Sequence, residues 1–198
     1  GGWQDGGGDG GGWGVGTSGG TRDGSGERRD TAFDDGGGVE TDGRGRCWGR
    51  NAAGQLGRGD IVSYEMPRPP LSEETLRFTK VAVSNGHSCG ITTSALLLCW
   101  GHNENLQLGS PGEDPFCSEC RTTLQQVPMA GWTDVSVGAR HTCGIREGEL
   151  FCWGSNAEGQ LGLDSATTGD FEPTRVNLPL IHISRCRRPP LRRPQCAQ

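Results

Sequence analysis

Nine cysteines in 198 residues are the side chains of this chain best suited to chemistry. Cys117 and Cys120 have the Cys-x-x-Cys spacing that occurs in zinc sites and in thiol–disulfide redox motifs. A structural zinc ion normally takes four protein ligands, and no second Cys-x-x-Cys or nearby Cys/His pair completes such a set. A redox motif begins a helix, which the neighbouring Pro111, Gly112 and Pro115 do not favour. We therefore expect a local Cys117–Cys120 disulfide and no metal site.

No group of residues in the sequence has the spacing of a known catalytic set. Gly14, Gly16 and Gly19 match the dinucleotide-binding fingerprint, but no apolar strand precedes them and no helix follows. His87 and His141 occupy the same place in two copies of one phrase, which favours a structural role over a role as ligands. We expect each histidine to follow a tight turn and to hydrogen-bond the backbone there. The sequence thus predicts a protein that is not an enzyme and has no cofactor.

The tripeptide Cys-Trp-Gly occurs three times, at residues 47–49, 99–101 and 152–154, and each copy opens a longer repeated phrase. Such self-similarity indicates one supersecondary unit stacked against copies of itself. Asn and Gly at fixed offsets suit a tight turn because both tolerate left-handed backbone angles. Leu106 replaces one of these glycines and predicts a strained or altered turn. Including the two histidines, the repeated positions are Trp48, Gly49, Asn51, Gly54, Gln55, Leu56, Gly57, His87, Trp100, Gly101, Asn103, Gln107, Leu108, Gly109, His141, Trp153, Gly154, Asn156, Gly159, Gln160, Leu161 and Gly162.

Short strands are the elements that must position these residues. Val81 and Val83 alternate with small residues, as do Val135 and Val137, and this period of two predicts strands with one buried face. Apolar runs follow at residues 96–100 and 150–153 and suit buried strands. Glu147-Gly148 before the second run is a hairpin signal.

The two hairpins place cysteines opposite each other. The two-residue turn brings Cys143 opposite Cys152. In the other copy a three-residue loop gives the same register and brings Cys89 opposite Cys99. Opposed residues have Cβ atoms about 4.5–5.5 Å apart, close to what a disulfide needs. We predict two disulfides, which would imply an oxidising compartment; four reduced, buried thiols are the alternative.

The phrases Val-x-Val-x-x-Gly/Arg-His-Ser/Thr-Cys-Gly-Ile and Cys-Trp-Gly-x-Asn-x-x-Gly-Gln-Leu-Gly resemble the repeats of the regulator of chromosome condensation family. The resemblance covers residues 47–183. It implies an all-β fold, a β-propeller typically of seven blades, each a four-stranded antiparallel sheet. The cysteine-bearing version is similar to the secreted branch of these repeats, including plant receptor-kinase ectodomains and bacterial surface proteins.

The chain holds sequence for about two to three blades, so we expect an incomplete propeller and a fragment of a longer protein whose other blades are missing. Residues 1–46 contain 19 of the 36 glycines and predict a disordered segment. Residues 47–184 form the repeats, about 2.5 blades. Residues 185–198 are an irregular Pro/Arg tail, either a basic arm or a solvated or out-of-frame end. A cysteine should precede Cys47 by about ten residues, but glycine stands there.

Function is predicted to lie in an assembled surface, since the repeated residues are structural. We expect a non-enzymatic protein-interaction module that binds an unidentified protein or surface partner. Guanine-nucleotide exchange on a small GTPase and substrate recognition for a ubiquitin ligase are the alternatives. The expected location is extracellular or secreted, with a cytoplasmic or nuclear one as the alternative. No apolar stretch approaches the roughly 20 residues that span a bilayer, and we do not expect nucleic-acid binding.

Overall fold

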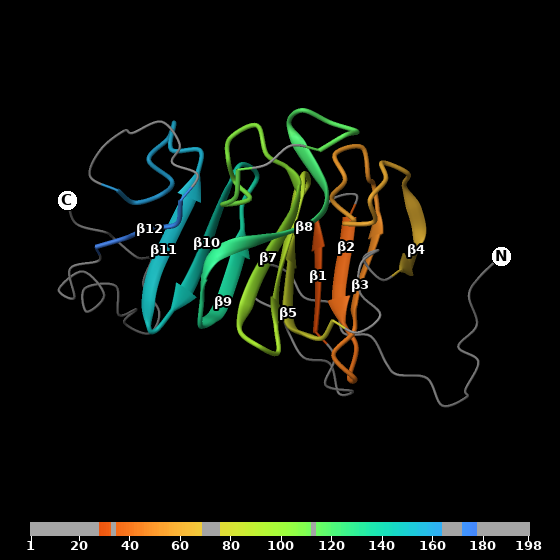
Figure 1. Ribbon diagram of the computed structural model, residues 1–198, viewed down its shortest axis with the longest axis horizontal. Coiled ribbons are helices and arrows are strands. Elements are labelled where there is room, and N and C mark those ends of the chain that lie inside the picture. The colour runs from red at the N-terminus through yellow and green to blue at the C-terminus, as the bar shows by residue number, and fades with distance from the viewer. Residues whose placement is uncertain (1–27, 33–34, 69–75, 112–113, 164–171, 178–198) are drawn as a thin grey trace, which may run out of the picture.

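The computed structural model describes residues 28–32, 35–68, 76–111, 114–163 and 172–177. In these residues the protein is all-β, with three four-stranded antiparallel sheets standing side by side in sequence order (Figure 1). Within each sheet the strands also follow sequence order. The predicted fold class and the four-stranded blade are therefore confirmed.

Each sheet contains four consecutive strands. The first sheet has β1 (Arg28–Ala32), β2 (Asp35–Val39), β3 (Gly45–Gly49) and β4 (Tyr64–Arg68). The second has β5 (Phe78–Val83), β6 (His87–Thr92), β7 (Leu96–His102) and β8 (Cys120–Ala130). The third has β9 (Trp132–Val137), β10 (His141–Arg146), β11 (Glu149–Gly154) and β12 (Thr174–Arg175).

Both predicted hairpin registers are present. Strands β6 and β7 pair Cys89 with Cys99. Strands β10 and β11 pair Cys143 with Cys152. The two copies reach the same register through loops of different length, because the buried faces of the strands must coincide whatever the loop.

The N-terminal expectation needs correction. Residues 1–46 were expected to be disordered, yet β1, β2 and the start of β3 lie within them, so the first sheet begins at residue 28 and not at 47. A Cβ added at Gly36 would collide with the Trp48 ring, and one at Gly37 would collide with Val83 of the next sheet. Glycine is therefore suited to these two strand positions, because side chains from other strands occupy the space that its own side chain would need. The segment 1–27 and the tail 185–198 lie outside the described residues.

The core lies between sheets. One buried cluster joins the first two sheets and includes Leu56, Phe78 and Trp100. A second joins the last two and includes Trp132 and Trp153, whose rings are 5.7 Å apart. Each sheet thus depends on its neighbour for burial. In the part of the chain that the structure describes, no helix has the length and apolarity needed to cross a membrane.

Candidate functional site

One end of the molecule is formed by the loops that follow each Cys-Trp-Gly and lead to the fourth strand of the sheet. These loops lie on the same side, at the top of Figure 1. We call this surface the loop face; its described residues are 50–63, 102–111, 114–119 and 155–163, with His102 also the last residue of β7. The hairpin turns, such as Glu147-Gly148 between β10 and β11, lie at the opposite ends of the strands.

The repeated Asn and Gln side chains hold the loops from inside. Each Asn Oδ1 accepts a backbone N–H five residues later, and each Gln Oε1 accepts one two residues earlier. The Asn pairs are Asn51 with Leu56 (2.9 Å), Asn103 with Leu108 (3.0 Å) and Asn156 with Leu161 (3.1 Å). The Gln pairs are Gln55 with Ala53, Gln107 with Asn105 and Gln160 with Glu158. The repeated Asn therefore acts as a buried acceptor, and the expectation that it supplies left-handed backbone was wrong.

Left-handed backbone occurs instead at the glycine of each turn. Gly54 and Gly159 have φ of 72° and 71°, and Leu106 takes φ of 60° at the equivalent place. The turn at Leu106 keeps the same backbone hydrogen bonds as the other two. The prediction of a strained turn is therefore confirmed, since a branched side chain in this region costs free energy.

Successive sheets are joined through the backbone carbonyl of the repeated Gln. Trp100 Nε1 and Ser88 Oγ both donate to the Gln55 carbonyl, at 2.7 and 2.9 Å. One period later Trp153 Nε1 and Thr142 Oγ1 both donate to the Gln107 carbonyl, at 3.0 and 2.7 Å. Trp100 and Trp153 thus pack between blades, as the repeat predicted.

His87 belongs to the same junction. Its ring is fully buried, with Nδ1 3.1 Å from Ser84 Oγ and Nε2 2.8 Å from Thr142 Oγ1. Since the Thr142 hydroxyl donates to Gln107, we assign the imidazole proton to Nε2. The expected turn before the histidine is present, but the ring bonds hydroxyl groups and not the backbone. Burial, with smaller contributions from His141 and His102, lowers the pKa of His87 from 6.5 to about 3.

The equivalent His141 is in a different environment. Its ring is only partly buried, and burial lowers its pKa to a lesser degree. Among the described residues no fourth sheet lies against it.

The predicted cysteine pairs come together in the structure. Cys89–Cys99 and Cys143–Cys152 have Cα–Cα distances of 4.1 Å, and their sulfur atoms are close enough to bond. Cys117 and Cys120 are likewise paired, with Cα atoms 5.3 Å apart. Opposite Cys47 lies Gly37, so the cross-strand pairing of the other two sheets does not occur there. Cys186 and Cys196 lie outside the described residues.

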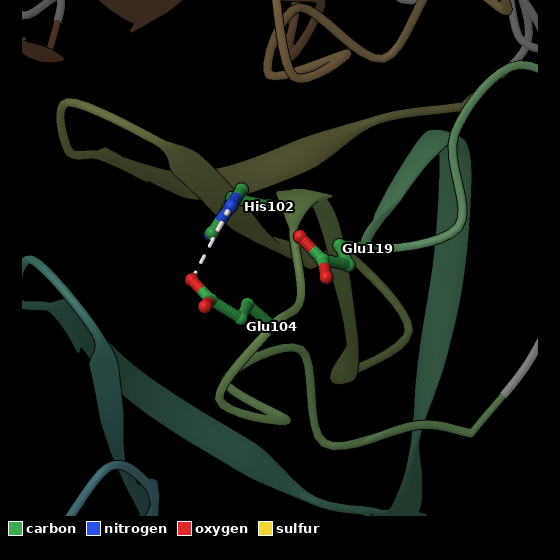
Figure 2. Close-up of side chains that lie close together, drawn as sticks. All are labelled: His102, Glu104 and Glu119. Atoms are coloured by element: carbon green, nitrogen blue, oxygen red, sulfur yellow. Dashed lines mark ion pairs between the residues drawn. The ribbon is translucent and has the colours of Figure 1, made fainter.

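A further feature of the loop face, a cluster of one histidine and two glutamates, was not predicted from the sequence. His102, Glu104 and Glu119 lie side by side, with one ligand atom from each within 4.8 Å of the others (Figure 2). His102 Nε2 is 3.9 Å from Glu104 Oε2. The expectation of no metal site considered Cys117 and Cys120 and overlooked this nitrogen–oxygen cluster. Glu119 sits in an insertion far from His102 in the sequence, and only the start of β8 beside the end of β7 brings them together.

Known protein families share the repeated phrases. Two sequence profiles, both described as the regulator of chromosome condensation (RCC1) repeat, match the chain. One matches residues 42–91 and 147–184, and the other matches residues 78–107 and 132–160.

Curated relatives and solved structures agree with these profiles. A probable E3 ubiquitin-protein ligase, HERC3 of Homo sapiens, is 33% identical over 70% of this chain and 13% of its own length. The mitochondrial RCC1 domain-containing protein RUG3 of Arabidopsis thaliana is 30% identical over 66% of this chain and 29% of its own length. Prp20p of Saccharomyces cerevisiae, described with binding properties to Gsp1p and histones, has a similar fold, with a TM-score of 0.67 at 16% identity. That match covers 76% of this chain and 38% of Prp20p. The chain therefore spans less than a third of these two curated relatives.

Proposed function

The chain belongs to the regulator of chromosome condensation (RCC1) repeat family, and from this premise we propose that it is a non-enzymatic module whose loop face binds a protein partner. Propeller relatives support a protein-interaction role in general, and the choice of the loop face is our inference. Because function resides in sites and not in folds, the inference depends on what that face displays.

The main support for this proposal is that the three loops share the same internal hydrogen bonds but display different residues at their surface. The Asn and Gln hydrogen bonds recur in all three described loops, whereas the residue after Cys-Trp-Gly is Arg50, His102 or Ser155. Large apolar side chains are also exposed on this face: Ile61 (49%), Val62 (56%) and Phe116 (62%). A rigid frame that displays apolar groups suits protein recognition, because ordering the loops costs little further entropy on binding.

Substrate recognition for a ubiquitin ligase is the second candidate. It is favoured by the 33% identity to HERC3, which covers only 13% of that ligase. Any ligase activity would need residues outside the aligned region. Nucleotide exchange on a small GTPase has less support, since the likeness to Prp20p is one of fold.

The relatives favour the intracellular alternative over the expected extracellular location. RUG3 is named as a mitochondrial protein, and no support for the secreted branch comes from the similarities above. In a reducing compartment the paired cysteines would be kept as thiols. Thiol mapping of the protein taken from cells therefore tests the location.

The binding proposal is tested by comparing the two ends of the strands. Phe116→Asp with Ile61→Asp changes the loop face, and Ile145→Asp near the hairpin turn is the matched control. Partners of the full chain are first identified by cross-linking mass spectrometry, and the purified partner is then titrated against each variant. We expect at least a tenfold loss of affinity for the loop-face variant alone, with unchanged circular dichroism. Equal loss in both variants, or cross-links confined to the hairpin end, would refute the proposal. Nucleotide-release assays on a panel of small GTPases test the exchange alternative directly.

A further inference from the structure

His102, Glu104 and Glu119 occur in one repeat only. The position of His102 is Arg50 in the first copy and Ser155 in the third. The position of Glu104 is alanine in both other copies, and Glu119 belongs to the insertion that precedes β8. Since the other two sheets form without these side chains, the blade does not require them. Because the blade fold does not account for this cluster, we look for a ligand that the three side chains could bind.

The three side chains converge from two segments. Figure 2 shows the His102 ring directed toward Glu104, with the Glu119 carboxylate beside them on the neighbouring segment. His102 is partly exposed and both glutamates are exposed, so water and ions reach all three. Two carboxylates this close repel each other when both are ionised, and a bound cation would remove that repulsion.

The backbone beneath the cluster is held in place. The His102 N–H donates to the Gly86 carbonyl at 2.8 Å, and the Asn103 N–H donates to the Glu119 carbonyl at 2.6 Å. The Asp114 carboxylate accepts from the N–H and hydroxyl of Thr122 and so fastens the other end of the insertion. These bonds fix the Cα positions of His102 and Glu119, while the exposed glutamate side chains remain able to rotate.

We propose that His102 Nε2 and the carboxylates of Glu104 and Glu119 bind a zinc ion, with water completing a tetrahedral site. Imidazole nitrogen and carboxylate oxygen bind Zn²⁺ at about 2.0–2.2 Å, which places ligand atoms about 3.3 Å apart. The ligand atoms are now within 4.8 Å of one another, so rotation of the two glutamates closes the site. The bound ion ties the insertion to the loop that carries Glu104, which fixes the shape of this part of the loop face.

Zinc binding at His102 would break a hydrogen bond between His102 and Gln107. Its Nε2 lies 3.3 Å from His102 Nδ1, and its Oε1 accepts from the Asn105 N–H. When zinc binds at Nε2, the imidazole proton lies on Nδ1. Nδ1–H and the Gln107 amide N–H₂ are then both donors, so the hydrogen bond between them is lost. A carboxylate at residue 107 would instead accept from both the Asn105 N–H and the Nδ1–H. Gln107→Glu should therefore strengthen zinc binding, as carboxylates behind metal-bound histidines do.

Metal titration of the full chain, purified with its disulfides intact and freed of metal by a chelator, tests the proposal. Calorimetry with ZnCl₂ should give one site per chain. His102→Ala and Glu119→Gln should each weaken it by more than the roughly 10- to 100-fold that loss of an outer-shell partner costs. Glu158→Gln, an exposed acid in the equivalent loop of the third sheet, is the matched control and should bind as the parent does. Circular dichroism checks that every variant folds.

Cobalt substitution separates this site from the cysteines. Co²⁺ bound by nitrogen and oxygen lacks the intense near-ultraviolet charge-transfer band that thiolate ligands produce. We expect a tetrahedral visible spectrum without that band, and tighter binding by Gln107→Glu if this variant folds. Absence of binding, binding unchanged in His102→Ala, or a thiolate band lost on alkylation would each overturn the proposal.

Discussion

The second and third sheets carry the same phrases, yet their histidines lie in different surroundings. His87 is fully buried because the third sheet covers it and Thr142 bonds its ring. His141 has the same place in its own sheet but is partly exposed. The same contrast holds for the cysteines, since Cys89 is fully buried and Cys143 is not.

This difference shows that the repeated residues serve the junction between blades more than their own blade. Trp153 and Thr142 belong to the third sheet but donate to Gln107 of the second. Lys80 of β5 also forms an ion pair with Asp134 of β9. The repeated His and the carbonyl of the repeated Gln thus have their full set of contacts only where a following sheet is present. The repeated Trp instead depends on the preceding sheet, as fully buried Trp153 shows. The variants below can test this contrast.

Loss of the junction tryptophan should have the largest effect. Trp153→Ala removes a fully buried ring and the hydrogen bond to Gln107, and should lower the free energy of unfolding by about 3–5 kcal/mol. Trp153→Phe keeps most of the packing and should cost mainly one hydrogen bond, about 1 kcal/mol. Urea unfolding followed by fluorescence measures both. Equal costs for the two variants would mean that packing at this junction contributes little.

Acid should destabilise the protein mainly through His87. Its folded-state pKa of about 3 lies below the unfolded value of 6.5, so the unfolded chain takes up the proton first as the pH falls. Stability is therefore lost between about pH 6.5 and 3, by about 1.4 kcal/mol per pH unit, or roughly 3 kcal/mol at pH 4.5. His87→Gln should flatten the profile, and His141→Gln should change it less. Unfolding at several pH values tests this, and identical profiles for the two variants would remove the contrast between the sheets.

The disulfides should contribute less and should differ in accessibility. Each closes a short loop, with sequence separations of 10 and 9 residues, so replacing either pair by serine should cost about 2–3 kcal/mol. A mild reductant without denaturant should open Cys143–Cys152 first, because Cys89 and Cys99 are fully buried. Alkylation and mass mapping follow each pair. Finding the four thiols still reduced in folded protein purified under oxidising conditions would contradict the disulfides themselves.

The smallest effect is expected at the left-handed turn position. A Cβ added at Gly159 meets no atom within 4 Å, so Gly159→Leu should cost only the backbone strain, about 1 kcal/mol. Leu106→Asn should recover a similar amount in the second loop, since Asn tolerates this conformation. Thermal unfolding of both variants is sufficient. Stabilisation by Gly159→Leu would show that φ at this position is not the limiting factor.

The glycine-rich start shows why composition misled the prediction for residues 28–46. Gly36 and Gly37 have no side chains to bury, so the composition of this segment alone resembles that of a linker. Trp48 and Val83 occupy the volume that these glycines leave open, and Val83 belongs to another sheet. A strand completed by distant residues leaves no local signal.

The sequence by itself determined the alternating strands, the two hairpin registers and the three cysteine pairs, and its resemblance to a known repeat family implied the four-stranded blade. The strands, registers and pairs follow from alternation, loop length and short spacing, which act between residues close in the chain. The tertiary structure decided what the repeated residues contact: the Gln107 carbonyl joins two sheets, Thr142 bonds His87, and Glu119 comes beside His102. Each of these contacts joins segments that only the stacking of blades and the pairing of β7 with β8 bring together, so no local pattern could specify them.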